Sequence, residues 1–112
     1  MEIWHNNRCS KSRDTLKIIE DHKVKVEIIN YLENPPSKEE IKAVLAKLGL
    51  KAQDIIRTSE SEFKEKYKGK KLSESEWIDV LVKNPKLIER PIVIKGEKAV
   101  IGRPPENVLQ LL

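Results

Sequence analysis

The chain has 112 residues and one cysteine, a length that predicts a single domain over residues 1–112 and a cysteine count that excludes an internal disulfide. Its 22 basic residues are interspersed with 18 acidic ones, so the net charge of +4 predicts no nucleic-acid partner. No apolar stretch approaches the roughly 18 residues of a membrane span, and there is no room for an export signal before the first strand-like run, so we expect a soluble, cytoplasmic protein without a membrane partner. No Cys/His spacing is typical of a metal site, so we expect no bound metal.

The first thirty residues predict a strand, a helix and a second strand. Ile3-Trp4 and their neighbours form the first strand, and apolar residues recur at helical spacing from Ser10 to about Asp21. Alternation of apolar with charged residues then indicates a half-buried strand at Val24, Val26 and Ile28. A right-handed crossover makes two such strands parallel, and ligands bind at their carboxyl ends, where Cys9 lies.

The middle of the chain, from about 37 to 83, predicts a helical insertion. Three pairs of a serine and a glutamate at capping-box spacing indicate helix starts: Ser37 with Glu40, Ser59 with Glu62, and Ser73 with Glu76. Gly49 closes the first of these helices, and residues 52–56 predict a short helical turn before the second.

The last part of the chain predicts a β-hairpin and a final helix. Residues 91–94 and 98–101 form the two strands around Gly96, Gly102 ends the hairpin, and Pro104-Pro105 opens a helix. The order is βαβ, a helical block, then ββα. This order predicts an α/β fold with the helical insertion between its two halves.

Cys9 is the candidate reactive group. It directly precedes a helix, where unpaired N–H groups and the positive end of the helix dipole favour a thiolate, and its neighbours are polar, so we expect an accessible sulfur. Ser12 occupies the place of the second cysteine in a Cys-x-x-Cys motif and cannot resolve a mixed disulfide. A reduction that ends in a disulfide therefore needs a thiol from another molecule.

Three arginines stand at element boundaries: Arg57 after an apolar pair, Arg90 before Pro91, and Arg103 between Gly102 and Pro104. A guanidinium presents a planar fork that suits tetrahedral oxyanions, so together they predict an anion site if they converge near Cys9. We also expect a cis peptide bond between Arg90 and Pro91. His5 is interpreted either as a residue that orients the loop or as a proton carrier.

Four segments carry a resemblance to a known family: His5-Asn6-x-x-Cys9-x-x-Ser12-Arg13, Ile55-Ile56-Arg57-Thr58, Ile88-Glu89-Arg90-Pro91-Ile92-Val93 and Ile101-Gly102-Arg103-Pro104. In order and spacing they resemble the glutaredoxin-linked arsenate reductases of the ArsC family, over residues 1–112. The resemblance implies a thioredoxin-like fold with a mixed sheet and the helical insertion. It also implies a catalytic thiolate at Cys9, arsenate bound by Arg57, Arg90 and Arg103, and support from His5, Ser12, Arg13 and Pro91.

The resemblance further implies arsenate or a similar oxyanion as substrate, no bound cofactor, glutathione as co-substrate and glutaredoxin as protein partner. In that mechanism Cys9 attacks arsenate, glutathione attacks the covalent adduct with reduction to arsenite, and glutaredoxin with glutathione releases the enzyme thiol. Asn7 departs from the pattern, because many members have proline after the His-Asn pair.

Two alternatives remain open at this stage. One is a thiol oxidoreductase of the same family that acts on another oxyanion or on mixed disulfides, since arginines do not separate arsenate from phosphate or sulfate. The other is a redox-sensitive regulator that binds RNA polymerase, as in a related branch. Those regulators typically have Cys-x-x-Cys, so Ser12 and the three arginines favour the enzyme.

Overall fold

The computed structural model describes residues 1–112, which form two compact units. The first, the sheet unit, combines Met1–Pro35 with Arg90–Leu112, and the second, the helical unit, comprises Pro36–Glu89. The helical unit contains the predicted insertion together with the last residues before the hairpin.

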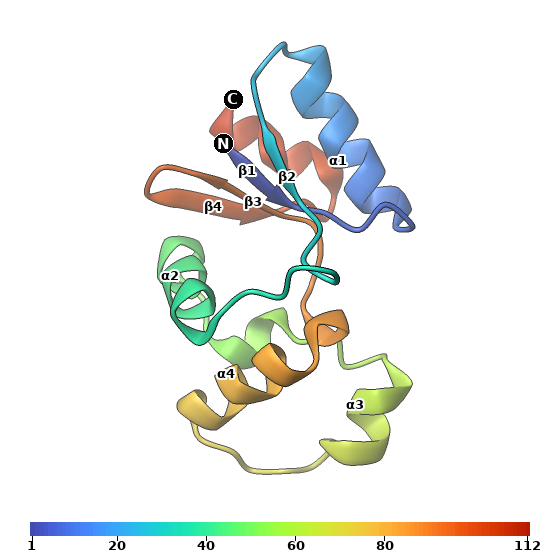
Figure 1. Cartoon of the computed structure of the whole chain (residues 1–112), viewed down its shortest axis with the longest axis vertical. Coiled ribbons are helices and arrows are strands. Elements are labelled where there is room, and N and C mark those ends of the chain that lie inside the picture. Colours follow the sequence, from blue (N-terminus) through green and yellow to red (C-terminus); the bar gives the residue numbers. More distant parts are fainter. The chain divides into compact units, whose positions relative to one another are not determined.

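The sheet unit is a mixed four-stranded sheet in the order β2-β1-β3-β4 (Figure 1). Strand β1 (Glu2–Trp4) pairs in parallel with β2 (Glu27–Ile29), and antiparallel with β3 (Ile92–Lys95). Strand β4 (Lys98–Ile101) completes the predicted hairpin with β3. The predicted α/β class, with parallel strands in the first half and a hairpin in the second, is confirmed.

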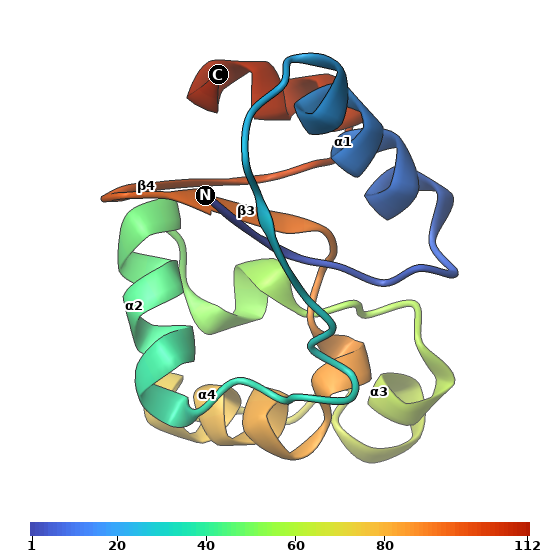
Figure 2. The same cartoon turned by 45° about the horizontal axis from the view of Figure 1, so that its top comes forward.

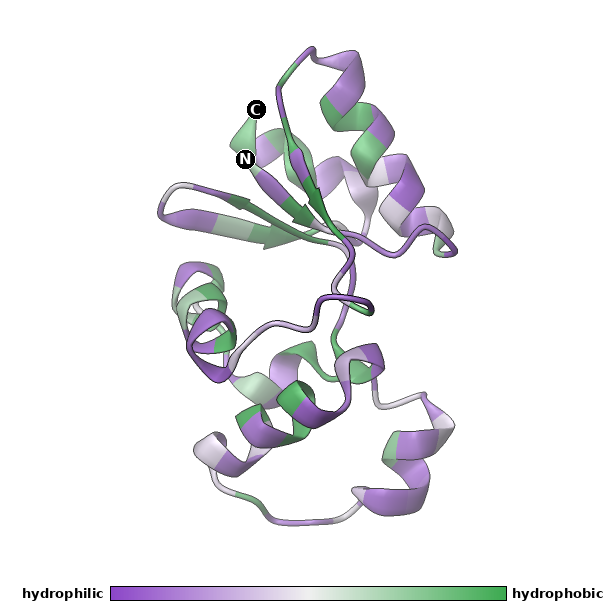
Figure 3. Cartoon of the chain, viewed as in Figure 1, coloured by the Kyte–Doolittle hydropathy of each residue, from purple (hydrophilic) through white to green (hydrophobic).

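Helix α1 (Ser10–Asp21) and the 3₁₀ helix η3 (Pro105–Leu111) cover the same face of this sheet and pack against each other (Figure 2). Hydrophobic residues occur along the strands and on both helices, as the hydropathy colouring of the ribbon shows (Figure 3). The core cluster consists of Ile3, Ile19, Val93, Val108 and Leu111. Burial of these side chains anchors both helices, because removing apolar surface from water stabilises the packed state.

The second strand is shorter than the alternating pattern predicts. Val24 and Val26 precede β2, although they still pack against the core cluster, and Ile28 is 50% exposed. Pairing begins where β1 begins, because Glu27 N–H donates to the Met1 carbonyl and Glu2 aligns with Glu27. The periodicity therefore predicted the strand and its apolar contacts, but it placed the start of the strand too early, at Val24 rather than Glu27.

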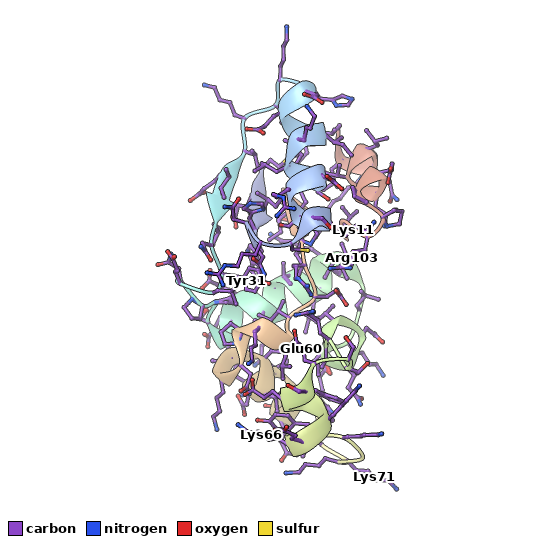
Figure 4. The ribbon with its side chains drawn as sticks, turned by 90° about the vertical axis from the view of Figure 1, so that its right-hand side faces the viewer. Lys11, Tyr31, Glu60, Lys66, Lys71 and Arg103 are labelled. Atoms are coloured by element: carbon purple, nitrogen blue, oxygen red, sulfur yellow. The ribbon has the colours of Figure 1, made fainter.

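The helical unit contains α2 (Lys38–Leu48), η1 (Ala52–Ile55), α3 (Ser61–Lys66), α4 (Glu74–Lys83) and η2 (Pro85–Leu87). Capping boxes at Ser37 and Ser73 are confirmed, and Gly49 ends α2 with a φ of 69°. That left-handed conformation favours glycine. Lys66 and Lys71 are exposed on this unit, and their side chains are labelled in Figure 4.

Two of the predicted helices differ from expectation. Helix α3 starts after Glu60 rather than at a Ser59 cap, because residues 57–60 form a turn in which Glu60 N–H donates to the Arg57 carbonyl. The final helix is a 3₁₀ helix, in which Asn107 N–H donates to the Pro104 carbonyl. No helix of the chain has both the length and the apolar character needed to cross a membrane.

Gly102 lies where α1 meets the start of β3. A Cβ atom built on it would be 2.5 Å from Thr15 Oγ1 and 2.8 Å from Pro91 Cγ. Thr15 is fully buried and Pro91 is buried, so neither neighbour has free space into which it can move. Any side chain at this position must displace the helix or the hairpin, because protein interiors are close-packed.

We predict that Gly102→Ala lowers the free energy of unfolding by about 1–3 kcal/mol through overpacking. Urea denaturation followed by circular dichroism measures the loss. Thr15→Ala removes two of the three closest atoms, so the double variant should lose less than the sum of the single variants. Equal stability of Gly102→Ala and the parent protein would contradict the close approach.

Candidate functional site

Cys9 occupies the N-cap position of α1, directly after the loop that follows β1. Its N–H donates to the Asn6 carbonyl over 3.0 Å, and its carbonyl accepts the first helical hydrogen bond from Arg13 N–H, also 3.0 Å. The expected accessible sulfur is corrected by the structure, since Cys9 is only 8% exposed. It nevertheless lies outside the apolar core cluster, and its sulfur contacts a cation.

That cation is Arg103. Its Nη2 lies 3.4 Å from Cys9 Sγ, a contact between residues 94 positions apart in the sequence. The side chain is held from a second side, because Arg103 Nε donates to the Arg90 carbonyl over 2.7 Å. Cys9 is the N-cap residue of α1. The guanidinium therefore lies at the amino end of the helix that Cys9 begins.

The sheet topology explains why residues from three chain segments meet here. The register pairs Trp4, the last residue of β1, with Ile92, the first of β3, and pairs Ile92 with Ile101, the last of β4. Loops that leave β1 and β4 therefore emerge at the same end of the sheet at which the chain enters β3. Antiparallel pairing brings Cys9, Arg90 and Arg103 to this one end of the sheet unit.

Arg90 differs from Arg103 in its hydrogen bonding. Its Nε is buried and has no hydrogen-bond partner, whereas its carbonyl accepts from Arg103. The peptide bond that follows it is cis, as expected, and Gly102 N–H donates to the Pro91 carbonyl over 2.9 Å. A buried donor without a partner is unusual, and an anion is a ligand that would satisfy it.

Arg57 belongs to the helical unit, so its convergence with Cys9 stays a prediction. Its Nη1 forms an ion pair and hydrogen bond with the Glu60 carboxylate and donates to the Lys86 carbonyl over 3.2 Å. The backbone on either side is fixed by an isolated bridge between Ile56 and Ile88. This guanidinium therefore has an acidic partner of its own, which the sequence motif did not reveal.

His5, Ser12 and Arg13 form a polar network around the Cys9 loop. His5 Nδ1 lies 2.7 Å from Ser12 Oγ, and the same oxygen accepts from Asn6 N–H over 3.0 Å. Arg13 Nη1 donates to the Asn7 carbonyl over 2.9 Å. These bonds connect the loop to the first turn of α1, and Ser12 is fully buried beneath them.

Burial, the largest influence, lowers the pKa of His5 below its ordinary value, and the charge of Arg13 acts in the same direction. A hydrogen bond with the Asn7 side chain and the charge of Glu20 oppose this shift. The net direction favours a neutral imidazole at pH 7. In that form, His5 suits a role in orienting the loop through Ser12.

Sequence reasoning did not identify three residues that hold segments carrying the predicted site residues. Thr15 Oγ1 donates to the Lys11 carbonyl over 2.8 Å and lies 3.4 Å from the Gly102 carbonyl. Asn107 donates to carbonyls on both sides of Gly102, and Glu60 pairs with Arg57 within the helical unit. Thr15 and Gly102 are 87 positions apart, so no spacing in the sequence marks their contact. The structure contains no group of three or more His, Cys, Asp or Glu side chains placed to hold a metal ion.

The family model described as the ArsC family matches residues 4–111. The chain belongs to the ArsC family. It is 43% identical to the uncharacterized protein YfgD of Escherichia coli (strain K12), with 100% of this chain and 96% of that protein covered. It is 40% identical to a protein of Haemophilus influenzae named arsenate reductase, with 98% of this chain and 97% of that protein covered.

A solved structure described as arsenate reductase from Vibrio cholerae matches with a TM-score of 0.95 and 42% identity, over 100% of this chain and 98% of that one. Membership in the ArsC family and this structural match confirm the thioredoxin-like fold expected from the resemblance.

The lowered pKa of His5 predicts a pH dependence of stability. Below about pH 6.5 the imidazole of the unfolded chain takes up a proton, whereas the buried imidazole resists protonation. The unfolded state then binds more protons, so the free energy of unfolding falls as the pH decreases from 7.5 towards 5.5. Urea midpoints measured across this range should decline for the parent protein and stay flatter for His5→Asn.

His22→Asn is the matched control, since His22 is the other histidine and lies exposed after α1. Its midpoints should follow those of the parent protein. Parallel curves for the parent protein and His5→Asn would contradict the assignment of this dependence to His5.

Proposed function

We propose that the protein is an arsenate reductase in which Cys9 forms a covalent adduct with arsenate and glutathione and glutaredoxin supply the electrons. The observation that carries this proposal is the 3.4 Å contact between Arg103 and the Cys9 sulfur, at an N-cap where helix N–H groups also face outward. Relatives and a structural neighbour named arsenate reductase support the same activity.

The proposed reaction begins with attack of the Cys9 thiolate on the arsenic atom, and one arsenate oxygen leaves as water after protonation. The thiolate of glutathione next attacks Cys9 Sγ, a disulfide bond forms, and the electron pair of the S–As bond returns to arsenic. Arsenic(V) thereby becomes arsenic(III) and leaves as arsenite. Glutaredoxin then takes the glutathionyl group from Cys9. A second glutathione removes this group from glutaredoxin, and glutathione disulfide is released.

In this proposal the arginines bind the oxyanion by charge-assisted hydrogen bonds. Arg103 stands at the sulfur, and the unpartnered buried Nε of Arg90 offers a further donor. Arg57 would join them from the helical unit, with Glu60 as the partner it holds in the unliganded protein. His5, Ser12, Arg13 and Pro91 would act by supporting the loop and the strand entry next to it.

The single cysteine requires that the reductant be an external thiol, which glutathione provides. We therefore propose glutathione as co-substrate, glutaredoxin as protein partner, no bound cofactor and a cytoplasmic location. We also propose that the sheet unit and the helical unit behave as one domain. Reduction of another oxyanion or of a mixed disulfide by the same thiol is the alternative activity, because guanidinium groups recognise charge and shape rather than the central atom.

The proposal predicts arsenate-dependent oxidation of NADPH in an assay coupled through glutathione, glutathione reductase and glutaredoxin. Cys9→Ser should abolish it, because a hydroxyl cannot form the thiol adduct. Arg103→Gln should lower kcat/KM by about 10- to 100-fold, the range expected when a charge-assisted hydrogen bond to an anion is lost.

Lys83→Gln is the control, since it removes the same charge from the exposed last turn of α4 and should leave kcat/KM unchanged. An inactive parent protein, assayed with coupling proteins that support a known arsenate reductase, would refute the proposed activity. Turnover of a mixed disulfide in place of arsenate would establish the alternative, and redox-dependent retention of RNA polymerase in a pull-down would support a regulator instead.

A further inference from the structure

Asn107 is the third residue of η3, and its side chain points back to the backbone that precedes the helix. Its Nδ2 donates to the Ile101 carbonyl over 3.1 Å and to the Arg103 carbonyl over 3.0 Å. The two acceptors flank Gly102. One amide nitrogen therefore bridges the turn from which the Arg103 side chain projects.

The chemistry of the two acceptors fixes the orientation of this amide. An amide nitrogen has two hydrogens and can donate both at once, whereas the amide oxygen placed there would face two carbonyl oxygens. A carboxylate at the same position would accept only and would repel both carbonyls. Asparagine thus meets the needs of this turn in a way that the equally sized aspartate does not.

The remaining restraints on this turn come from other segments of the sheet unit. Gly102 N–H donates to the Pro91 carbonyl, and Arg103 Nε donates to the Arg90 carbonyl. Thr15 packs against Gly102 from α1. Asn107 contributes the restraint from the C-terminal side. The backbone of Arg103 is therefore fixed at the base of the side chain that extends to Cys9.

From these contacts we infer that Asn107 is a positioning residue that sets the distance between the Arg103 guanidinium and the Cys9 sulfur. Loss of its bridge lets the turn relax and weakens the contact between the Arg103 guanidinium and the Cys9 sulfur. The effect on the sulfur stands without any assumption about the substrate, whereas the effect on arsenate rests on the proposed function.

A purely structural role for Asn107 would have a different signature. Its neighbours Val108 and Leu111 belong to the core cluster, so apolar burial anchors η3 without the Asn107 amide. We therefore expect Asn107 variants to fold and to retain the helix. Their defect should appear at Cys9 rather than in the unfolding transition alone.

The test compares Asn107→Ala and Asn107→Asp with Gln110→Ala and Gln110→Glu, matched changes at an exposed position of the same 3₁₀ helix. The first readout is the rate constant for alkylation of Cys9 by iodoacetamide at pH 7. We expect about a 3- to 10-fold decrease in this rate constant for both Asn107 variants. Both Gln110 variants should stay within about twofold of the parent protein.

A double-variant cycle shows whether the effect passes through Arg103. In an Arg103→Gln background, Asn107→Ala should produce no further decrease in the alkylation rate, because the cation that it positions is absent. An undiminished effect in that background, or an unchanged rate for Asn107→Ala alone, would overturn the inference. If Asn107→Ala fails to fold, Asn107→Ser, which keeps one donor, takes its place with the same criteria.

The second readout is the KM for arsenate, which should rise about 3- to 10-fold for Asn107→Ala with a smaller change in kcat. A parent protein without arsenate turnover would refute the proposed function. The rate constants for alkylation of Cys9 would still decide whether Asn107 positions Arg103. The two failures are therefore distinguishable.

Discussion

The contact between the Arg103 guanidinium and the Cys9 sulfur is the interaction on which the rest of the site depends. Helix α1 alone would present the sulfur to its own N–H groups, and only the pairing of β1 with β3 and of β3 with β4 brings a cation to it. The register of the sheet therefore determines whether a cation lies beside the sulfur. A shift of one residue in the pairing of β3 with β4 would displace the segment that carries Arg103 from the end of the sheet at which Cys9 lies.

Maintaining that contact requires close packing around Gly102. Because Gly102 has no side chain, the end of the hairpin can approach Thr15 and Pro91. Hydrogen bonds then restrain its backbone: Gly102 N–H donates to the Pro91 carbonyl, and Asn107 donates to the carbonyls of the two residues that flank Gly102. Flexibility of glycine would otherwise loosen the turn. Tight packing and polar restraint therefore act together, the first by excluding movement and the second by satisfying buried donors and acceptors.

The three arginines are chemically alike in sequence and different in their surroundings. Arg103 is held by the Arg90 carbonyl and faces sulfur, Arg90 has a buried Nε without a partner, and Arg57 pairs with Glu60. An anion would satisfy the Arg90 donor, whereas Arg57 already has a carboxylate partner within the helical unit.

Local sequence determined the element types, the capping boxes at Ser37 and Ser73, and the position of Cys9 at a helix start. It also determined the parallel pairing of β1 with β2 and the β3–β4 hairpin, because these follow from short connections. The pairing of β1 with β3 was not predicted. Local sequence misplaced the starts of β2 and α3, where pairing with β1 and the Arg57 to Glu60 turn override local pattern. Only the tertiary structure decided the burial of Cys9, the approach of Arg103, and the contacts of Thr15, Gly102 and Asn107. Cys9 meets Arg103 across 94 positions and Thr15 meets Gly102 across 87, and residue spacing carries no information about such contacts. The contacts of Asn107 are local, but they depend on the backbone path around Gly102, which no periodicity predicts.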